Sequence, residues 1–423
     1  MNAEPLSVLQ PPTLRAFRGY GIELEYMIVD KENLSVLPIS DQLLRMAAGN
    51  EDYEVNRGML GWSNELVLHV IEVKNLRPIS ALSMLPKAFQ AEVRIINEML
   101  DRLGGRLMPT AMHPWMDPRT ETRLWPHQNE AIYNAYDRIF DSKSHGWANL
   151  QSMHINLPFG DDREFARLHA AIRLVLPILP ALAASSPIAG HADTRCADYR
   201  MLVYWGNSEK VPSLTGQVIP QNASSRAEYE ASILAPMYRD IAPYDPEGVL
   251  RYEWLNSHGA IARFDRNAIE IRVVDTQECP HADLAVAAAA SFVTRKLYAA
   301  GETGLASQQA VSTETLAGIL RAGVCDAERS MIEDAGYLAL LGFPGRRCGA
   351  RELWSHLIEQ MLNEDIEHAP LWREPLQVIL DQGPLARRIL RAVGGDFSHR
   401  RLQAVYRELC DCLQEARMFG ADG

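Results

Sequence analysis

The stretch Tyr20-Gly-Ile-Glu-Leu-Glu-Tyr-Met-Ile-Val29 decides what kind of sheet this chain can form. Its residues alternate, so the apolar side chains from Ile22 to Ile28 share one face of a strand and Glu23 and Glu25 share the other. Such two-faced strands are typical of an antiparallel sheet that is covered on one side. The two carboxylates lie about 6.6 Å apart along the strand and repel each other unless water or a cation intervenes. The strand therefore either contributes to a Mg²⁺ or Mn²⁺ site or is a solvated edge strand.

A second strand, predicted from Glu65 to Val73, carries two more acidic residues. Glu65 and Glu72 are seven residues apart, which places them on opposite faces unless a bulge intervenes. We therefore expect at most one of them to join the first pair. Glu72 stands among apolar residues, where an unpaired charge is costly, and Lys74 is a candidate partner.

Two later strands add a histidine and an ion pair. The strand predicted over residues 151–157 places His154 on its polar face, where a lone histidine usually serves only as a hydrogen-bonding residue. The strand predicted over residues 268–274 places Glu270 and Arg272 on one face. Alone, such a pair is worth little. Beside carboxylate-bound metals it would supply another ligand and a cation for a phosphate or an acyl intermediate.

Taken together, the polar faces of these four strands indicate a site for several metal ions and a phosphate. Other common motifs are absent from the sequence: it has no GxxxxGK[ST] phosphate loop, no GxGxxG turn, no HExxH and no GxSxG. Two loops add candidates. His113 follows a predicted strand and could line a pocket. Arg195 and Arg200 are either solvated or hold a phosphate or a substrate carboxylate.

Composition narrows the class of protein. The 423 residues include 42 basic and 54 acidic side chains, a formal charge of −12, and 47% hydrophobic residues. This usage is globular, and the acidity argues against nucleic acid or an anionic membrane as a partner. Six cysteines without a CxxC pair indicate free thiols in a reducing cytosol. We see no secretion signal, and the longest apolar stretch carries two prolines, so we expect a cytoplasmic protein.

The chain divides by pattern into a mixed part and a helical part. We expect a catalytic domain over residues 14–300, in which short strands alternate with helices, and a helical extension over residues 301–423 that packs on it. The remaining predicted strand covers residues 106–111. The predicted helices cover residues 81–103, 129–142, 163–184, 351–362, 385–393 and 399–416. Pro177 and Pro180 should interrupt the third helix, and Gly394 should end the fifth.

The order of these motifs resembles the second glutamate–cysteine ligase family. That family includes bacterial carboxylate–amine ligases and is related to plant glutamate–cysteine ligase and, more distantly, to glutamine synthetase. The resemblance covers roughly residues 14–295. The residues that carry it are Gly21-Ile-Glu23-Leu-Glu25, the strand with Glu72, His113-Pro114, the strand with His154, Ala181-Leu-Ala-Ala-Ser-Ser-Pro187 with Asp193-Thr-Arg195, and Ile269-Glu270-Ile-Arg272-Val-Val-Asp275-Thr276.

The resemblance implies an α+β fold in which a curved antiparallel sheet forms a cradle with helices on its convex side. It implies ATP and two or three Mg²⁺ or Mn²⁺ ions on the concave side. The metal ligands would be Glu23, Glu25, Glu72, His154 and Glu270. Arg272 would stabilise the transferring phosphoryl group, and Arg195, Arg200 and His113 would contact phosphate or substrate.

The reaction that the resemblance implies joins small-molecule substrates. A carboxylate, such as the γ-carboxylate of glutamate, attacks ATP, and an amine such as that of cysteine attacks the resulting acyl phosphate. The products are an amide, ADP and phosphate. The resemblance also allows a homo-oligomer.

The sequence departs from the family pattern at two positions. Ser152 stands where relatives often carry the first histidine of His-x-His, and Leu68 stands where bacterial relatives carry a second glutamate. These departures would alter one metal site or the position of the nucleotide, or mark a relative with another pair of substrates. Two other functions also stay open: a phosphotransferase of the guanidino-kinase type, and a catalytically silent scaffold. A carboxylate-rich polar face argues against the kinase, which relies on arginines, and retention of the motif residues argues against the scaffold.

Overall fold

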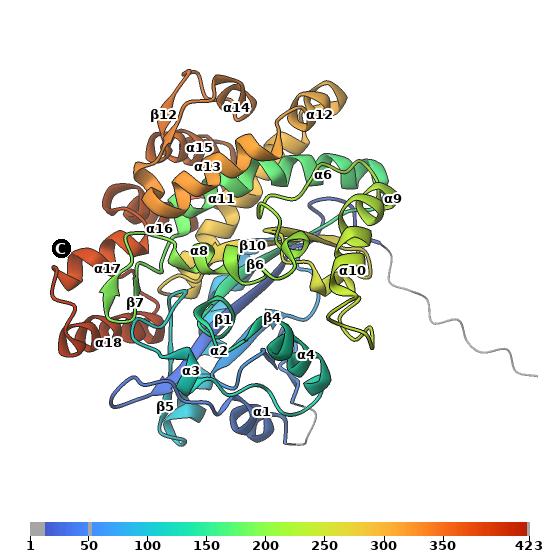
Figure 1. Cartoon of the computed structure of the whole chain (residues 1–423). Helices are drawn as coiled ribbons and strands as arrows, with labels where there is room; N and C mark the ends of the chain where they lie inside the picture. The colour runs from blue at the N-terminus through green and yellow to red at the C-terminus, as the bar shows by residue number, and fades with distance from the viewer. Residues whose placement is uncertain (1–12, 50–52, 421–423) are drawn as a thin grey trace, which may run out of the picture.

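Strand β1 (Gly21–Asp30) lies at the centre of an eight-stranded sheet in the computed structural model, which describes residues 13–49 and 53–420 (Figure 1). The other strands are β2 (Val55–Asn56), β3 (Leu60–Asn64), β4 (Val70–Asn75), β5 (Gly105–Met108), β6 (Ser152–Pro158), β9 (Ala260–Arg263) and β10 (Ala268–Asp275). Their order is β2-β3-β4-β1-β6-β10-β9, and β5 also pairs with β1. Every pair in the sheet is antiparallel, which confirms the predicted fold class.

The apolar face of the sheet is covered by helices. Ile22, Leu24, Tyr26 and Ile28 are at most 1% exposed and belong to one continuous hydrophobic core. Helices α2 (Leu85–Asp101), α6 (Asp162–Val175) and α11 (Pro280–Tyr298) bury their apolar residues in that core. Figure 1 shows α6 and α11 side by side above the strands. Burial of each such large side chain contributes about 1.5–3 kcal/mol to the stability of the fold. Because the apolar face supplies this stability, the opposite face of the sheet can carry charged side chains.

Prolines divide the long apolar stretch after β6, as predicted. Helix α6 is followed by a 3₁₀ turn, η2 (Leu176–Ile178), which contains Pro177, and then by α7 (Leu179–Ala183), which has Pro180 in its first turn. The stretch Asp162–Ala183 is long and apolar enough to cross a membrane, but it is almost entirely buried inside the protein, as the core helix of a globular fold would be.

The C-terminal part is mainly helical and packs on the helices behind the sheet. Its helices are α12 (Gly301–Gln309), α13 (Thr313–Asp326), α14 (Ala335–Leu340), α15 (Ala350–Glu364), α16 (Ala369–Gln382), α17 (Leu385–Val393) and α18 (His399–Glu415). Helices α15 and α16 contact α11, and α18 contacts α2 and β5. Gly394 ends α17 in a left-handed conformation, as predicted. A short ladder between β11 (Met331–Ile332) and β12 (Cys348–Gly349) was not predicted. The division into domains at residue 300 stays a prediction.

The strand predicted from Glu65 to Val73 is wrong in its first half. The chain forms β3 before it, turns over residues 65–69, and enters β4 at Val70. In the turn, the Leu68 N–H donates to the Arg123 carbonyl, and the Leu68 carbonyl accepts from the Ser40 N–H. These hydrogen bonds replace the strand-to-strand hydrogen bonds that the apolar pattern predicted for residues 65–69. Strands β2, β3 and β9 were not predicted.

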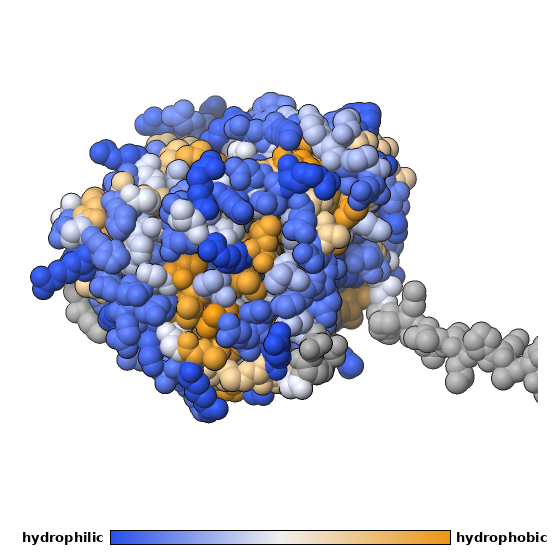
Figure 2. Space-filling model, turned by 60° about the horizontal axis from the view of Figure 1, so that its bottom comes forward, coloured by the Kyte–Doolittle hydropathy of each residue, from blue (hydrophilic) through white to orange (hydrophobic). Residues whose placement is uncertain are grey.

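The solvent-facing surface is mostly polar. Figure 2 shows one face on which hydrophilic residues dominate and hydrophobic residues gather in a band near the middle. Large apolar side chains that are exposed among the described residues are few and include Met59 and Leu76.

A buried ion pair ties the C-terminal helices to the end of the central sheet. Arg388 on α17 contacts Glu278, which follows β10, and the two residues are 2% and 0% exposed. Arg388 also donates to the Phe419 carbonyl at 3.0 Å. Because both charges are out of water, each depends on the other for compensation.

We expect the substitution Arg388→Ala to lower the free energy of unfolding by about 3–5 kcal/mol, since it leaves the Glu278 carboxylate buried without a partner. Urea unfolding followed by circular dichroism would measure the change. Arg400 on α18 is exposed, so Arg400→Ala is a matched control that should stay within about 0.5 kcal/mol of wild type. Equal stabilities of the two variants would contradict this account of the ion pair.

Candidate active site

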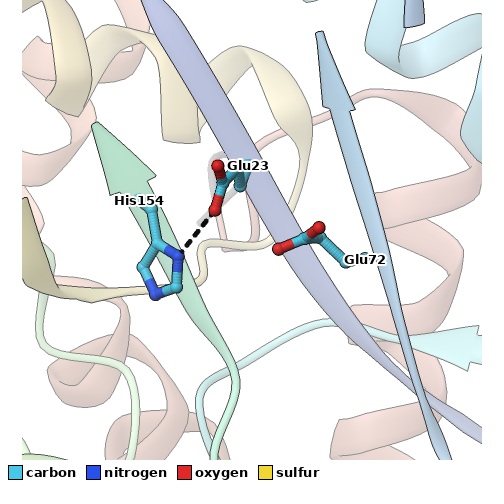
Figure 3. A group of neighbouring side chains, drawn as sticks. All are labelled: Glu23, Glu72 and His154. Carbon is cyan, nitrogen blue, oxygen red and sulfur yellow. Dashed lines mark hydrogen bonds and ion pairs between the residues drawn. The ribbon is translucent and has the colours of Figure 1, made fainter. Parts of the chain in front are cut away.

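The register of four neighbouring strands brings six of the predicted metal-ligating or phosphate-binding residues together. Glu23 on β1 lies opposite His154 on β6 and opposite Lys74 on β4. Two residues along β1, Glu25 lies opposite Glu72. Figure 3 shows the side chains of Glu23, Glu72 and His154 turned toward one another from three strands. Glu270 and Arg272, on β10, complete the set from the far side of β6.

Histidine 154 links the two glutamates of β1. Its Nδ1 lies 3.0 Å from a carboxylate oxygen of Glu23, and its Nε2 lies 3.8 Å from one of Glu25. Ser152 donates from its backbone N–H to Glu25 at 2.7 Å, and its hydroxyl lies 3.0 Å from His154 Nε2. Burial alone would lower the pKa of His154, but Glu23, Glu25 and Glu270 outweigh it and raise the pKa. The serine at position 152 thus takes part in the polar cluster.

Glu65 joins the cluster, contrary to the expectation that only one of Glu65 and Glu72 would do so. Donor atoms of Glu25, Glu65 and Glu72 lie within 4.8 Å of one another, and so do those of Glu23, Glu72 and His154. The turn at residues 65–69 is the reason, since it lets Glu65 return to the face that Glu72 occupies. We call these five residues, together with Glu270, the carboxylate cluster.

The carboxylate cluster fits divalent cations. Burial, followed by the charges of Glu25 and Glu72, raises the pKa of Glu65 well above its usual range. Burial and the charge of Glu72 likewise raise the pKa of Glu25, against the opposing charge of His154. Such repulsion is relieved by a hard cation, and four or more carboxylates with one histidine form a donor set that suits Mg²⁺ or Mn²⁺.

Basic residues surround the cluster. Lys74 contacts Glu72 at 2.6 Å, as the sequence suggested, and this partner raises the pKa of Lys74 to about 12 against the opposing effect of burial. Arg272 contacts Glu270 at 2.9 Å. Burial would raise the pKa of Glu270, but Arg272 and His154 lower it, so this carboxylate stays charged.

Arg200 is anchored beside the cluster, whereas Arg195 and His113 lie away from it. Arg200 is 2% exposed and pairs with Asp275. Arg195 has an 89% exposed side chain whose only ion pair among the described residues is with Asp193, at 3.8 Å. His113 is buried, its Nε2 lies 2.8 Å from the Leu34 carbonyl, and burial lowers its pKa to about 3. Neither Arg195 nor His113 lines a cavity next to the cluster.

Two cavities open on either side of the carboxylate cluster. The first, about 440 Å³, is lined by Glu25, Glu65, His154, Arg200 and Arg272, and by an aromatic wall of Tyr133, Tyr136, Trp147, Tyr204 and Trp254. The second, about 640 Å³, is lined by Glu23, Lys74, Asn156 and Arg266 and by apolar side chains such as Leu14 and Leu76. We call them the aromatic cavity and the Lys74 cavity. Groups bound in the two cavities would meet at the carboxylates.

Sequence reasoning missed Glu65 as a cluster member, and it missed Arg266 and the aromatic wall. A seven-residue spacing along one straight strand excludes Glu65, but the chain turns between β3 and β4. The signal that was available is Leu60-Gly-Trp-Ser-Asn64, a short strand that ends in a turn-forming asparagine. No local pattern identifies the aromatic residues, since they come from four separate segments.

We expect Glu65→Gln to stabilise the metal-free protein by about 1 kcal/mol, because it removes a carboxylate whose folded-state pKa is raised. The sign follows from linkage: a raised pKa favours the protonated form in the fold, so the contribution of Glu65 to stability falls as pH rises above the usual carboxyl range. The same substitution should weaken Mn²⁺ or Mg²⁺ binding. Thermal unfolding with EDTA and with excess Mg²⁺ measures both effects.

The control is Glu367→Gln, at an exposed position on the C-terminal side of α15. It should change neither the melting temperature in EDTA nor the rise that Mg²⁺ produces. If Glu65→Gln lowers the melting temperature in EDTA and keeps the full Mg²⁺ response, Glu65 is a structural residue and not a ligand.

Known proteins resemble this chain in sequence over most of its length. Residues 20–408 match the family model described as "Glutamate-cysteine ligase family 2(GCS2)". An uncharacterized protein of Archaeoglobus fulgidus is 31% identical over 403 residues, which cover 94% of this chain and 99% of that protein. A Bradyrhizobium protein (strain ORS 278) named "Putative glutamate--cysteine ligase 2" is 26% identical over 230 residues, 53% of this chain and 50% of its own.

A solved structure shows the same fold. The glutamate–cysteine ligase of Francisella tularensis, in complex with AMP, superimposes with a TM-score of 0.55 and 12% identity, over 95% of this chain and 90% of that chain. At this identity the likeness concerns the fold alone, and it agrees with the antiparallel sheet and the C-terminal helices described above.

Proposed function

This chain belongs to glutamate–cysteine ligase family 2, and on that premise we propose that it is an ATP-dependent carboxylate–amine ligase. The observation that carries the proposal is the position of the carboxylate cluster between two cavities, with Arg272 lining the aromatic cavity beside it. A ligase of this kind needs a nucleotide and an organic carboxylate to approach one point despite their like charges. We infer that glutamate is the carboxylate, and that cysteine or another small amine is the acceptor.

We assign the nucleotide to the Lys74 cavity. It is the larger of the two, and Lys74 and Arg266 line it together with the amides of Asn156 and Asn267. Cations of this kind compensate phosphate oxygens, and the apolar side chains of the cavity suit a base. The organic substrates then occupy the aromatic cavity, where Arg200 and Arg272 are the cationic side chains.

The proposed reaction has two steps. An oxygen of the substrate carboxylate attacks the γ-phosphorus of ATP, ADP leaves, and an acyl phosphate forms. The amine nitrogen then attacks the acyl carbon, loses a proton, and expels phosphate to give the amide. Arg272, which contacts Glu270 at 2.9 Å, would stabilise the phosphoryl oxygens during both steps.

The carboxylate cluster would hold the divalent cations. Glu23 lines the Lys74 cavity, Glu25, Glu65 and His154 line the aromatic cavity, and Glu72 and Glu270 contact these residues or their partners between the strands. Bound there, Mg²⁺ would neutralise the phosphates and the carboxylate so that they can approach.

The activity test is a coupled ADP-release assay with Mg²⁺-ATP, glutamate and a panel of amino acids and amines, with mass spectrometry of the products. A γ-glutamyl amide formed together with ADP and phosphate supports the ligase. A stable phosphorylated product would instead support the guanidino-kinase alternative, and absence of ATP turnover with every pair would support the silent scaffold.

We expect Glu23→Gln to reduce Mg²⁺-dependent turnover by on the order of 100-fold or more, because it removes a proposed ligand and the carboxylate that contacts His154. Circular dichroism should show an unchanged fold. The Glu367→Gln variant serves as the control and should retain wild-type turnover. Wild-type activity in Glu23→Gln would refute the assignment of Glu23 as a metal ligand.

A further inference from the structure

A third cavity lies on the helical side of the sheet, between the start of α2, helix α11 and helices α15 and α16. Its volume is about 320 Å³, and none of its lining residues belongs to the carboxylate cluster or to the cavities beside it. We call it the α11 cleft and define it by Tyr20, Ser83, Ser291, Arg295, Asp365 and Trp372. Cavities that enclose small organic ligands begin at about this size, near 300 Å³.

One wall of the α11 cleft suits an anion. Arg295, in the last turn of α11, forms no ion pair with any residue that the structure describes, and its guanidinium carbon lies 5.8 Å from the Phe292 ring centre. The cleft is also lined by Leu82 and Ser83, in the 3₁₀ turn η1 (Leu82–Met84) that leads into the 17-residue helix α2. None of the described side chains caps this start, so the helix dipole favours a negative charge there. The Met84 and Leu85 N–H groups already donate to the Ala81 and Leu82 carbonyls and Pro86 has no N–H, so Arg295 is the main attraction for an anion.

A second part of the cleft lining suits a cation. Glu364 ends α15 and Asp365 caps it, so two carboxylates lie where the helix dipole favours positive charge. Asp365 contacts His368 at 2.9 Å, and Glu364 contacts Lys296 at 2.7 Å. Burial raises the pKa of Tyr20, and Arg295 lowers it while Asp365 raises it, so both opposite charges act on the same phenol.

The floor of the cleft holds a hydroxyl without a partner. Ser291 is 5% exposed, and its Oγ forms no hydrogen bond with any described residue. Serines within helices usually bond back to a carbonyl one turn earlier, and a buried hydroxyl left unpaired costs about 1–3 kcal/mol. Phe292 and Trp372, 5% and 2% exposed, line the cleft as apolar surface. The cleft therefore combines an anion wall, a cation wall, an unpaired hydroxyl and an apolar patch.

We propose that the α11 cleft binds a small zwitterion, a free α-amino acid, with its carboxylate toward Arg295 and the start of α2 and its ammonium toward Asp365. The site is separate from the proposed substrate cavities and does not depend on the ligase function. Tyr20 directly precedes β1, so the bound molecule contacts the chain immediately before the strand that carries Glu23 and Glu25.

Isothermal titration calorimetry on the full chain, free of metal and nucleotide, tests the proposal. The probes are glycine, L-serine, L-cysteine, L-glutamate and L-phenylalanine, with propionate and propylamine as half-zwitterion controls. We expect at least one amino acid to bind with a stoichiometry of one. Propionate and propylamine, which each carry only one of the two charges, should both bind more weakly than that amino acid. Arg295→Gln should weaken that binding by roughly tenfold or more, since it removes a charge-assisted contact.

Two further variants separate the cleft from other sites. Arg373→Gln changes an exposed arginine on neighbouring α16 and should leave binding unchanged. Glu23→Gln should also leave it unchanged, because Glu23 lies on the other side of the sheet. The proposal is overturned if none of the amino acids binds, if Arg295→Gln binds like wild type, or if Glu23→Gln loses the binding. Thermal unfolding of Arg295→Gln, an exposed position, verifies that the variant is folded.

Discussion

Two carboxylates, Glu25 and Glu72, lie directly opposite each other on neighbouring strands, and the architecture of the site depends on how the protein tolerates that contact. Like charges in this position destabilise a sheet. The register cannot slip to separate them, because a shift of one residue would turn the buried residues from Ile22 to Ile28 toward the charged face. Hydrophobic burial against the helices therefore holds together two groups that would otherwise move apart.

The surrounding residues compensate this charge only in part. Ser63 donates to Glu72 at 2.8 Å, Lys74 pairs with the same carboxylate, and Ser152 donates to Glu25. Glu65, which faces the aromatic cavity, receives no such contact from the residues that the structure describes. The fold thus fixes the carboxylates in place although their negative charge is only partly compensated. Charged groups held in fixed positions stabilise the transition state in many enzymes.

Local pattern predicted β1 to within one residue and placed Glu23 and Glu25 on a shared face, because alternation depends only on neighbouring residues. It failed at Leu66-Val-Leu68, which looks like a strand but finds its partners in segments distant in sequence, at Ser40 and Arg123. The same limit applies to the site. His113 follows a strand, as functional residues often do, yet its ring is used to hold the Leu34 carbonyl. Tertiary contacts decide which polar side chains remain available for binding or catalysis. A single sequence does not reveal those contacts.

The pair of Glu278 and Arg388 has a consequence for how the protein is made. The two residues are 110 positions apart in the chain, so the carboxylate that closes the end of β10 is synthesised well before its partner. At elongation rates of about 5–20 residues per second, Glu278 waits roughly 5–20 s on the ribosome for Arg388 to emerge. During that interval the charged Glu278 cannot be buried at the end of the central sheet, because its partner Arg388 is not yet present. Helix α17 therefore completes this part of the core only after Arg388 has emerged, long after the sheet strands themselves have been made.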